Sequence, residues 1–515
     1  MSIAAGCFYT VVLNHDGKLY SSGCNLNGVL AQGARRDERR FLSIPAAGSF
    51  RKLDGGMQHW LAVDDDGRLW ACGSNHYGQL GLLEIETLRL RAVKGFGGKR
   101  VASIACGLAH SLVCTAAGLL FAAGCNSDGQ LGVGDFTNRS QFAAVYHRPG
   151  LVRSAGLPFP ESSLRVSLAP GSLAAGGWHS ACVDSEGCVR TWGSAIGTEP
   201  GVGLPAWCRA QMPIPSKLDP QLFGGDRVLA VAAGHFHAVA VTRRAVFSWG
   251  DAFEGCLGHG DWENLPLPKA IAPLVQENPI PYYVHCPDND PRFLREGHVT
   301  SVACGPYHNI AVHSSGSVYV WGDNRKGQLG LGDRESPVTV PVSMFNFLAM
   351  ERSLDDTIME ARAGTEHCAA VSKRGELWTW GRCQAGGALK IPCGLGVVDK
   401  QTFAALPRRV TALFDDSDTP GNACLGRWHG ICTRNALAWL MGTLPRGEQH
   451  PGTRRSRRIA ELRICWVASL PEELVKKILD KCRGADGWFV GAWTAEKQDK
   501  AWERVCDELR ARFGR

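Results

Sequence analysis

The segment Gly107-Leu-Ala-His110 is followed, 17 residues after its glycine, by Gly124, and this pair is one copy of a recurring pattern. The distance between the two glycines is 17 residues in six copies and 16 in two. The first copy, at Gly6, has Tyr9 in the place of the histidine. A repeat this regular indicates a repeat architecture. The copies with histidine are Gly56 with His59, Gly107 with His110, Gly176 with His179, Gly234 with His237, Gly305 with His308, Gly364 with His367, and Gly426 with His429.

Each copy has the pattern of a β-hairpin. In the third copy an apolar, β-prone run follows His110, a turn ends at Gly118, and a second apolar run leads to Gly124. Successive first glycines are 50 to 71 residues apart. A unit of that length holds four strands, which is the size of a propeller blade, and closing the units into a ring removes the need for caps at the ends.

Two further elements recur in the copies. A Trp-Gly pair ends the second strand, as at Trp321-Gly322, and a Gly-Gln-Leu-Gly loop follows, as at Gly129 to Gly132. Together with Gly-x-x-His, these elements strongly resemble the regulator of chromosome condensation repeat family, over residues 1–442. The resemblance implies an all-β fold, a seven-bladed β-propeller. The sequence beyond it predicts a small α-helical C-terminal appendage.

The sequence allows either seven or eight blades, and we expect seven. Only five residues precede Gly6, so we expect the first hairpin to lack a strand that Phe403–Leu413 then supplies from the far end of the repeats. That arrangement gives seven blades and leaves the last hairpin over. In the alternative, Cys424–Gly442 begins an eighth blade.

The evenly spaced histidines are not expected to form a catalytic or metal site. Equivalent positions around a ring are far apart and do not converge on one ion. We expect each histidine to be buried and to hydrogen-bond backbone in a neighbouring strand or loop. The sequence contains no phosphate-binding loop, zinc-protease or nucleophile-elbow motif, so no catalytic residue, metal or cofactor is predicted.

Candidate partner-binding residues lie where the repeat is interrupted. The insertion at 135–173 carries Arg139, Tyr146 and Arg148, and the one at 265–297 carries Tyr282 and Tyr283. A solvated loop is the alternative in both places. The founding member of the family is an exchange factor for the GTPase Ran and uses a wedge from one propeller face, so the resemblance makes a small GTPase a candidate partner. The basic N-terminal tail of the chromatin-bound member is missing, and nucleic acid is not an expected partner.

The sequence pattern changes after Gly442, where the repeats end. Residues 443–468 are predicted to be a basic linker with the run Arg454–Arg458, and residues 469–515 a helical tail. Leu470, Pro471 and Leu474 begin a segment that resembles the opening of an F-box, the helical element that docks a Skp-type adaptor. A helical hairpin without that role is the alternative.

Bulk composition is that of an ordinary globular protein, with 44% hydrophobic and 20% charged residues and a net charge of +7. Twenty cysteines without a Cys-x-x-Cys pair indicate buried thiols in a reducing compartment. No signal peptide or transmembrane segment is expected, so the predicted location is intracellular, cytoplasmic or nuclear. The predicted function is a non-enzymatic scaffold that binds protein partners. The alternatives are guanine nucleotide exchange on a small GTPase and an F-box substrate receptor of a ubiquitin ligase.

Overall fold

The computed structural model describes residues 1–145, 164–194, 211–272, 298–344, 357–382, 384–385, 391–392 and 403–410, without positions 26, 47, 170, 333 and 335. The chain divides into two compact units, Met1–Pro420 and Gly421–Arg515. The described residues all belong to the first unit. The predicted boundaries at 442 and 468, the eighth hairpin and the helical tail lie outside them.

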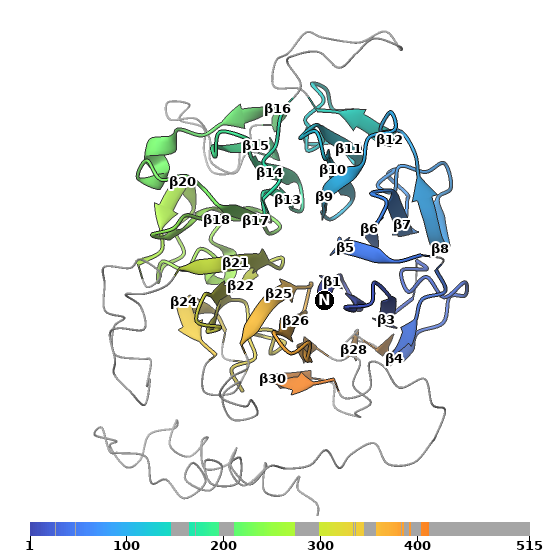
Figure 1. Ribbon diagram of the computed structural model, residues 1–515. Coiled ribbons are helices and arrows are strands. Elements are labelled where there is room, and N and C mark those ends of the chain that lie inside the picture. The colour runs from blue at the N-terminus through green and yellow to red at the C-terminus, as the bar shows by residue number, and fades with distance from the viewer. Residues whose placement is uncertain are drawn as a thin grey trace, which may run out of the picture. The chain divides into compact units, whose positions relative to one another are not determined.

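Seven four-stranded antiparallel sheets are arranged around a common centre, and the first strand of each lies nearest that centre (Figure 1). This confirms the all-β, seven-bladed propeller. Blades 1 to 4 consist of β1 (Ser2–Ala5), β2 (Tyr9–Leu13), β3 (Leu19–Gly23) and β4 (Glu38–Ser43); β5 (Phe50–Gly55), β6 (His59–Asp64), β7 (Leu69–Ser74) and β8 (Glu86–Val93); β9 (Val101–Cys106), β10 (His110–Thr115), β11 (Leu120–Gly124) and β12 (Arg139–Ala144); and β13 (Leu173–Ala175), β14 (His179–Val183), β15 (Val189–Ser194) and β16 (Gln211–Lys217).

The remaining blades have the same order of strands. Short 3-10 turns, η1 (Pro220–Phe223) and η2 (Phe253–Gly255), and a small hairpin of β28 (Gln384–Ala385) and β29 (Ile391–Pro392) complete the described elements. Blades 5 to 7 consist of β17 (Ala230–Ala233), β18 (His237–Val241), β19 (Val246–Gly250) and β20 (Leu265–Ala270); β21 (Val299–Cys304), β22 (His308–His313), β23 (Val318–Gly322) and β24 (Val338–Ser343); and β25 (Ile358–Ala363), β26 (His367–Ser372), β27 (Leu377–Arg382) and β30 (Phe403–Arg409).

The predicted strand exchange between the ends of the repeat region is wrong. The four residues of β1 supply the inner strand of blade 1, with Ile3 and Ala4 buried. Strand β30 pairs with β27 and is the outer strand of blade 7. Because each blade is built from consecutive strands, the ring closes by packing of blade 7 against blade 1 and by a hydrogen bond from Thr365 N to Gly6 O of 3.0 Å.

In each of the seven described blades, the second glycine of the repeat lies at an irregularity in its sheet. In blade 3 the register between β11 and β12 shifts between Ala122 and Gly124, and Gly124 has a φ of 114°. A Cβ there would lie 2.5 Å from Ala109 O. Only glycine combines that backbone angle with that close approach, which explains why the Trp-Gly element ends in glycine.

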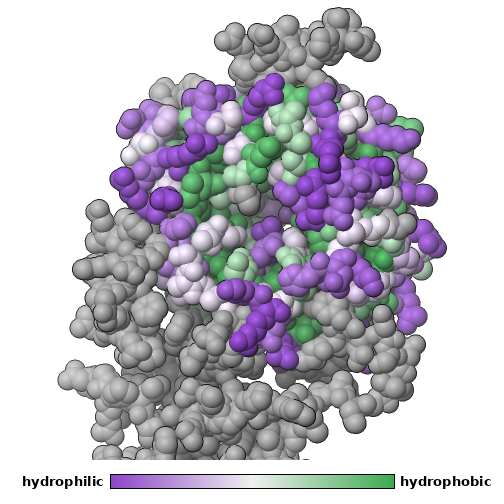
Figure 2. All heavy atoms as spheres, viewed as in Figure 1, coloured by the Kyte–Doolittle hydropathy of each residue, from purple (hydrophilic) through white to green (hydrophobic). Residues whose placement is uncertain are grey.

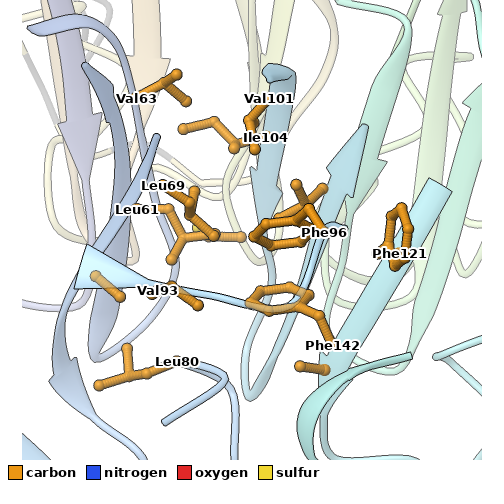
Figure 3. Packing of buried hydrophobic residues seen from close by; sticks show 14 of the residues in the cluster. Leu61, Val63, Leu69, Leu80, Val93, Phe96, Val101, Ile104, Phe121 and Phe142 are labelled. Carbon is orange, nitrogen blue, oxygen red and sulfur yellow. The ribbon is translucent and has the colours of Figure 1, made fainter. Parts of the chain in front are cut away.

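The hydrophobic core is divided among the interfaces between neighbouring blades. Between blades 2 and 3, Leu61 and Val63 of β6 face Ile104 of β9 and the rings beyond it (Figure 3). Phe96, from the link between the blades, packs edge-on against Phe121 with ring centres 5.5 Å apart. Each blade thus buries its faces against its neighbours, as a propeller requires.

The strands alternate in direction, which gives the ring two faces. The Gly-x-x-His turns, between the first and second strands, and the loops between the third and fourth strands lie on one face, called here the turn face. The hairpin turns between the second and third strands and the links between blades lie on the other, called the opposite face.

Candidate functional site: the turn face of the propeller

The first glycines of the seven blades surround a small central cavity of about 80 Å³ at the turn face. A Cβ at Gly107 would lie 2.4 Å from Gly176 O of the next blade and 2.6 Å from the ring of His110. Backbone N–H groups of the turns donate across the blades, for example from Leu108 to Gly176 O at 3.1 Å. The cavity has room for a few water molecules and is much smaller than a nucleotide site.

Five of the six described repeat histidines connect their blade to the next one through a side chain. His59 Nε2 lies 2.8 Å from Ser111 Oγ, and the Ser111 hydroxyl donates to Gln79 O at 2.7 Å. Because the serine proton goes to Gln79, the serine oxygen accepts from His59. The expected backbone partner of the histidine is therefore corrected to a side chain of the next blade. Equivalent contacts join His110 to Ser180, His237 to Asn309, His308 to Cys368, and His367 to Thr10.

The repeat tryptophan also donates to a loop carbonyl of the preceding blade. Gln130 O accepts from the Ser180 hydroxyl and from Trp192 Nε1, both at 2.8 Å. Trp380 Nε1 donates to Gln328 O at 2.8 Å. Both acceptors belong to the Gly-Gln-Leu-Gly loop of the preceding blade. The three recurring sequence elements thus form one set of contacts between blades.

Burial keeps the repeat histidines uncharged. It lowers the pKa of His59, His110 and His179 to about 3, and that of His237, His308 and His367 to about 4. All six are at most 1% exposed. A neutral, enclosed imidazole that already has a partner is suited to packing rather than to proton transfer with a ligand.

A row of aromatic side chains crosses the turn face from blade 4 to blade 6. Trp178 stacks on Phe236 with parallel rings and centres 4.6 Å apart. His235 packs edge-on against Trp178 and against Tyr307, at 5.5 and 5.4 Å. Tyr307 in turn meets Phe253 at 4.9 Å. We call these five residues the aromatic row, and all of them are at least partly exposed.

The aromatic row was not among the predicted site residues. Four of its members are the variable residues of the Gly-x-x-His turns, in Gly176-Gly-Trp-His179, Gly234-His-Phe-His237 and Gly305-Pro-Tyr-His308. The signal was in the sequence, because aromatic residues occupy these positions in three consecutive blades. Since repeats place equivalent residues side by side on one face, that run predicts a contiguous aromatic surface.

Charged groups lie beside the outer end of the row. Arg325 of blade 6 pairs with Asp323 at 2.9 Å and with Glu254 of blade 5 at 3.0 Å. The Arg325 guanidinium holds the pKa of Asp323 below its usual range. In blade 7, Arg382 pairs with Glu366 at 2.5 Å. The turn face therefore presents fixed charges next to aromatic rings.

The predicted partner-binding residues are mostly outside the described part of the chain. Arg139 begins β12, where its guanidinium pairs with Asp135 at 2.5 Å and donates to Thr137 O at 2.7 Å. These contacts anchor it to its own loop. Outside the described residues lie Tyr146, Arg148, Tyr282, Tyr283, Leu470, Pro471 and Leu474.

One group of side chains has the spacing of metal ligands in the described residues, namely Asp184, Glu186 and Cys188. Asp184 Oδ1 accepts from the backbone N–H of Glu186 and of Cys188, both at 3.0 Å. Asp184 Oδ2 pairs with Arg190 at 2.9 Å. Both carboxylate oxygens thus stabilise the hairpin turn.

In the part of the chain that the structure describes, no helix has the length and apolarity needed to cross a membrane.

Comparison with known proteins agrees with this geometry. Two models of the regulator of chromosome condensation (RCC1) repeat match the chain, one at residues 50–79, 101–130 and 299–328 and the other at 66–114, 245–312 and 315–371. The chain therefore carries RCC1 repeats, and they form a seven-bladed β-propeller.

The relatives of the chain differ in their described roles. It is 27% identical over 395 residues to the ultraviolet-B receptor UVR8 of Arabidopsis thaliana, covering 74% of this chain and 76% of the receptor. It is 29% identical over 362 residues to the secretion-regulating guanine nucleotide exchange factor of Mus musculus, covering 66% and 70%. The structure of Prp20p from Saccharomyces cerevisiae superposes with a TM-score of 0.58 at 18% identity, covering 78% and 87%, which shows the shared fold.

Proposed function

We propose that this chain is a protein-binding propeller that receives its partner on the turn face. Eleven large hydrophobic side chains are exposed among the described residues, and six of them lie in turn-face loops. Only two lie in loops of the opposite face, Leu168 and Leu229. Exposed apolar residues that gather on one face are typical of an interaction surface. The six are Tyr77, Leu83, Ile85, Phe136, Phe253 and Trp262.

The kind of residue also supports docking. Aromatic side chains are enriched in the centres of protein interfaces, where they contribute large contact areas at low entropic cost. The aromatic row adds half-buried rings to the exposed Phe253, which is 49% exposed, and Trp262 in the same loop is 56% exposed. Figure 2 shows one face of the molecule, where hydrophobic residues gather over the blades of β13 to β20 and hydrophilic residues cover much of the rim.

Affinity purification of tagged full-length chain tests this proposal. The turn-face variant carries Phe136→Ser, Phe253→Ser and Trp262→Ser, and the matched control carries Leu168→Ser and Leu229→Ser on the opposite face. We expect the turn-face variant to lose the proteins that co-purify with the natural chain, and the control to keep them. Retention by the turn-face variant and loss by the control would reverse the assignment of the face.

Guanine nucleotide exchange is the second candidate function. It is favoured by the similarity to an exchange factor over 66% of this chain. Such a propeller would act by deforming the nucleotide site of a bound GTPase, without catalytic residues of its own. Release of fluorescent GDP from a panel of small GTPases tests it: acceleration that the turn-face variant abolishes supports exchange through this face, and no acceleration across the panel leaves binding alone.

A further inference from the structure

The loops of the two faces differ in charge. In the described residues, the turns and loops of the turn face contain ten acidic and five basic residues, whereas the turns and links of the opposite face contain eight acidic and eleven basic ones. In the described part of the ring, the turn face is thus the more acidic side. A partner that docks there meets a negative potential, which favours a positively charged segment.

Four of the ten acidic residues lie in one loop, which also contains Phe253 of the aromatic row. The loop 251–264 of blade 5 carries Asp251, Glu254, Asp261 and Glu263 and no lysine or arginine. Its histidine does not offset them, because burial lowers the pKa of His259 to about 4. Burial also lowers the pKa of His235, within the row, to about 4. Neither imidazole therefore adds a positive charge at neutral pH that would oppose the binding of a cation.

This surface already holds one guanidinium group. Arg325 lies between Asp323 and Glu254, its Nε and the Asp323 Oδ1 being 2.9 Å apart. These carboxylates raise its pKa, with the hydrogen bond to Asp323 as the largest cause. Glu254 directly follows Phe253, whose ring packs on Tyr307. The neighbourhood of the row is thus an environment that stabilises an arginine side chain.

Aromatic rings and carboxylates together recognise a cation in two ways. A guanidinium stacks on an aromatic face through cation–π attraction, and its planar fork pairs with carboxylates. Lysine makes the same charge contact but lacks the flat surface for stacking. An exposed ring next to an acidic loop therefore favours arginine over lysine.

We propose that the aromatic row and the acidic loop 251–264 bind arginine side chains of a basic segment of a partner protein. This inference rests on the proposed docking of a partner at the turn face and adds the chemistry that is recognised. Trp178 and Phe253 lie at the two ends of the row, so each offers a stacking surface to a different arginine. Asp261 and Glu263, in the loop that carries Phe253, contribute carboxylates.

The probe is a fluorescein-labelled hexa-arginine peptide, titrated with full-length chain and followed by fluorescence anisotropy, with hexa-lysine and hexa-glutamate peptides in parallel. We expect saturable binding of hexa-arginine, weaker binding of hexa-lysine and none of hexa-glutamate. A row variant, Trp178→Leu with Phe253→Leu, keeps apolar bulk but removes the rings, and is expected to weaken hexa-arginine binding about tenfold. A loop variant, Asp261→Asn with Glu263→Gln, is expected to weaken it about fivefold at low salt.

The matched control is Glu186→Gln on the opposite face, which is expected to bind hexa-arginine as the natural chain does. Circular dichroism and the thermal midpoint establish that each variant is folded. Equal affinity for hexa-lysine and hexa-arginine, or unchanged binding by the row variant, would overturn the inference. If the row variant loses the co-purifying partner but binds hexa-arginine unchanged, the docking face stands and the arginine specificity falls.

Discussion

A single residue position decides how each repeat histidine is satisfied. The residue after the histidine of one blade faces the histidine of the blade before it, as Ser111 faces His59 and Ser180 faces His110. In blade 5 this position is Ala238, so among the described residues His179 lacks the side-chain hydrogen bond that the other five repeat histidines make. The interface between blades 4 and 5 is therefore without this recurring side-chain contact.

Ala238→Ser should restore that bond and stabilise the protein. A hydroxyl at 238 would give His179 the acceptor that His110 finds in Ser180, and a buried hydrogen bond of this kind contributes about 1 kcal/mol. The thermal midpoint should rise, while Ser180→Ala, the reverse change one blade earlier, should lower it. A lower midpoint for Ala238→Ser would show that His179 is satisfied in another way.

The buried histidines also predict how stability depends on pH. Their folded-state pKa values of about 3 to 4 lie below the ordinary value of 6.5, so between these limits the unfolded chain binds more protons than the folded one. The contribution of the histidines to stability is complete about one pH unit above 6.5 and falls as the pH decreases through 6.5, by up to about 1.4 kcal/mol per histidine for each pH unit. Asp54, whose pKa burial raises to about 6, opposes this as a single group.

Urea denaturation at pH 7.5, 6.5, 5.5 and 4.5 measures this dependence. The midpoint should decrease slightly between pH 7.5 and 6.5, where the histidines of the unfolded chain begin to take up protons, and more steeply at the lower values. His59→Gln, which cannot titrate, should reduce the slope by the share of one histidine. A midpoint that is flat down to pH 4.5 would mean that the histidines are protonated in the folded protein.

At the level of the element, the Gly-x-x-His turn connects neighbouring blades. Its glycine lets the turn lie close to the backbone of the next blade, and its histidine contacts the second strand of that blade. The spacing correctly predicted the hairpin that follows each of these turns, such as the one of β10 and β11, because strand alternation and glycine positions follow from local geometry. The strand exchange was wrong because a strand of four residues, Ser2–Ala5, is too short to stand out in the sequence. Apolar residues before the other first glycines, as in Val101–Cys106, were the available signal.

Gly107→Ala should weaken the joint between blades 3 and 4 severely. The added methyl group would lie 2.4 Å from Gly176 O, a contact with backbone that no rotamer relieves. We expect a loss of about 3 kcal/mol or more, as for overpacking in a core. Gly98→Ala is the control, because its Cβ would meet nothing within 4 Å and its positive φ of 75° costs about 1 kcal/mol. Equal midpoints for the two variants would show that the close approach is not a constraint.

The aromatic row is a feature that was not predicted from the sequence. The residues between the glycine and the histidine look variable in the sequence, and only the ring places those of blades 4, 5 and 6 side by side. The insertions that interrupt the repeat were predicted to bind a partner. Arg139 is the one residue of those insertions that was predicted and that the structure describes, and its side chain pairs with Asp135 of its own loop. The solvent exposure of a side chain and its ion-pair partners depend on the folded structure, and the spacing of the repeat residues in the sequence does not determine them.

For the whole molecule, the net charge of +7 is unevenly distributed. Residues Met1–Pro420 contain 38 basic and 38 acidic residues, and Gly421–Arg515 contain 18 and 11, so the second unit carries the entire excess. The first unit is neutral as a whole and acidic in the described loops of its turn face. This distribution disfavours nucleic acid as a ligand of the propeller.

The F-box-like opening of the tail remains a prediction. If Leu470 and Pro471 begin an adaptor-binding helix, full-length chain should co-purify with a Skp-type adaptor. Leu470→Ala with Pro471→Ala should abolish that binding, whereas Phe253→Ser on the propeller should leave it intact. Binding that survives the double substitution would remove the F-box interpretation.

Hydrogen–deuterium exchange of the full-length chain, alone and bound to a protein that co-purifies with it, tests the docking face most directly. We predict slower exchange on binding in the turn-face segments 234–236, 251–264 and 305–307, with little change in the opposite-face segments 94–100 and 313–317. Protection confined to the opposite-face segments would contradict the account.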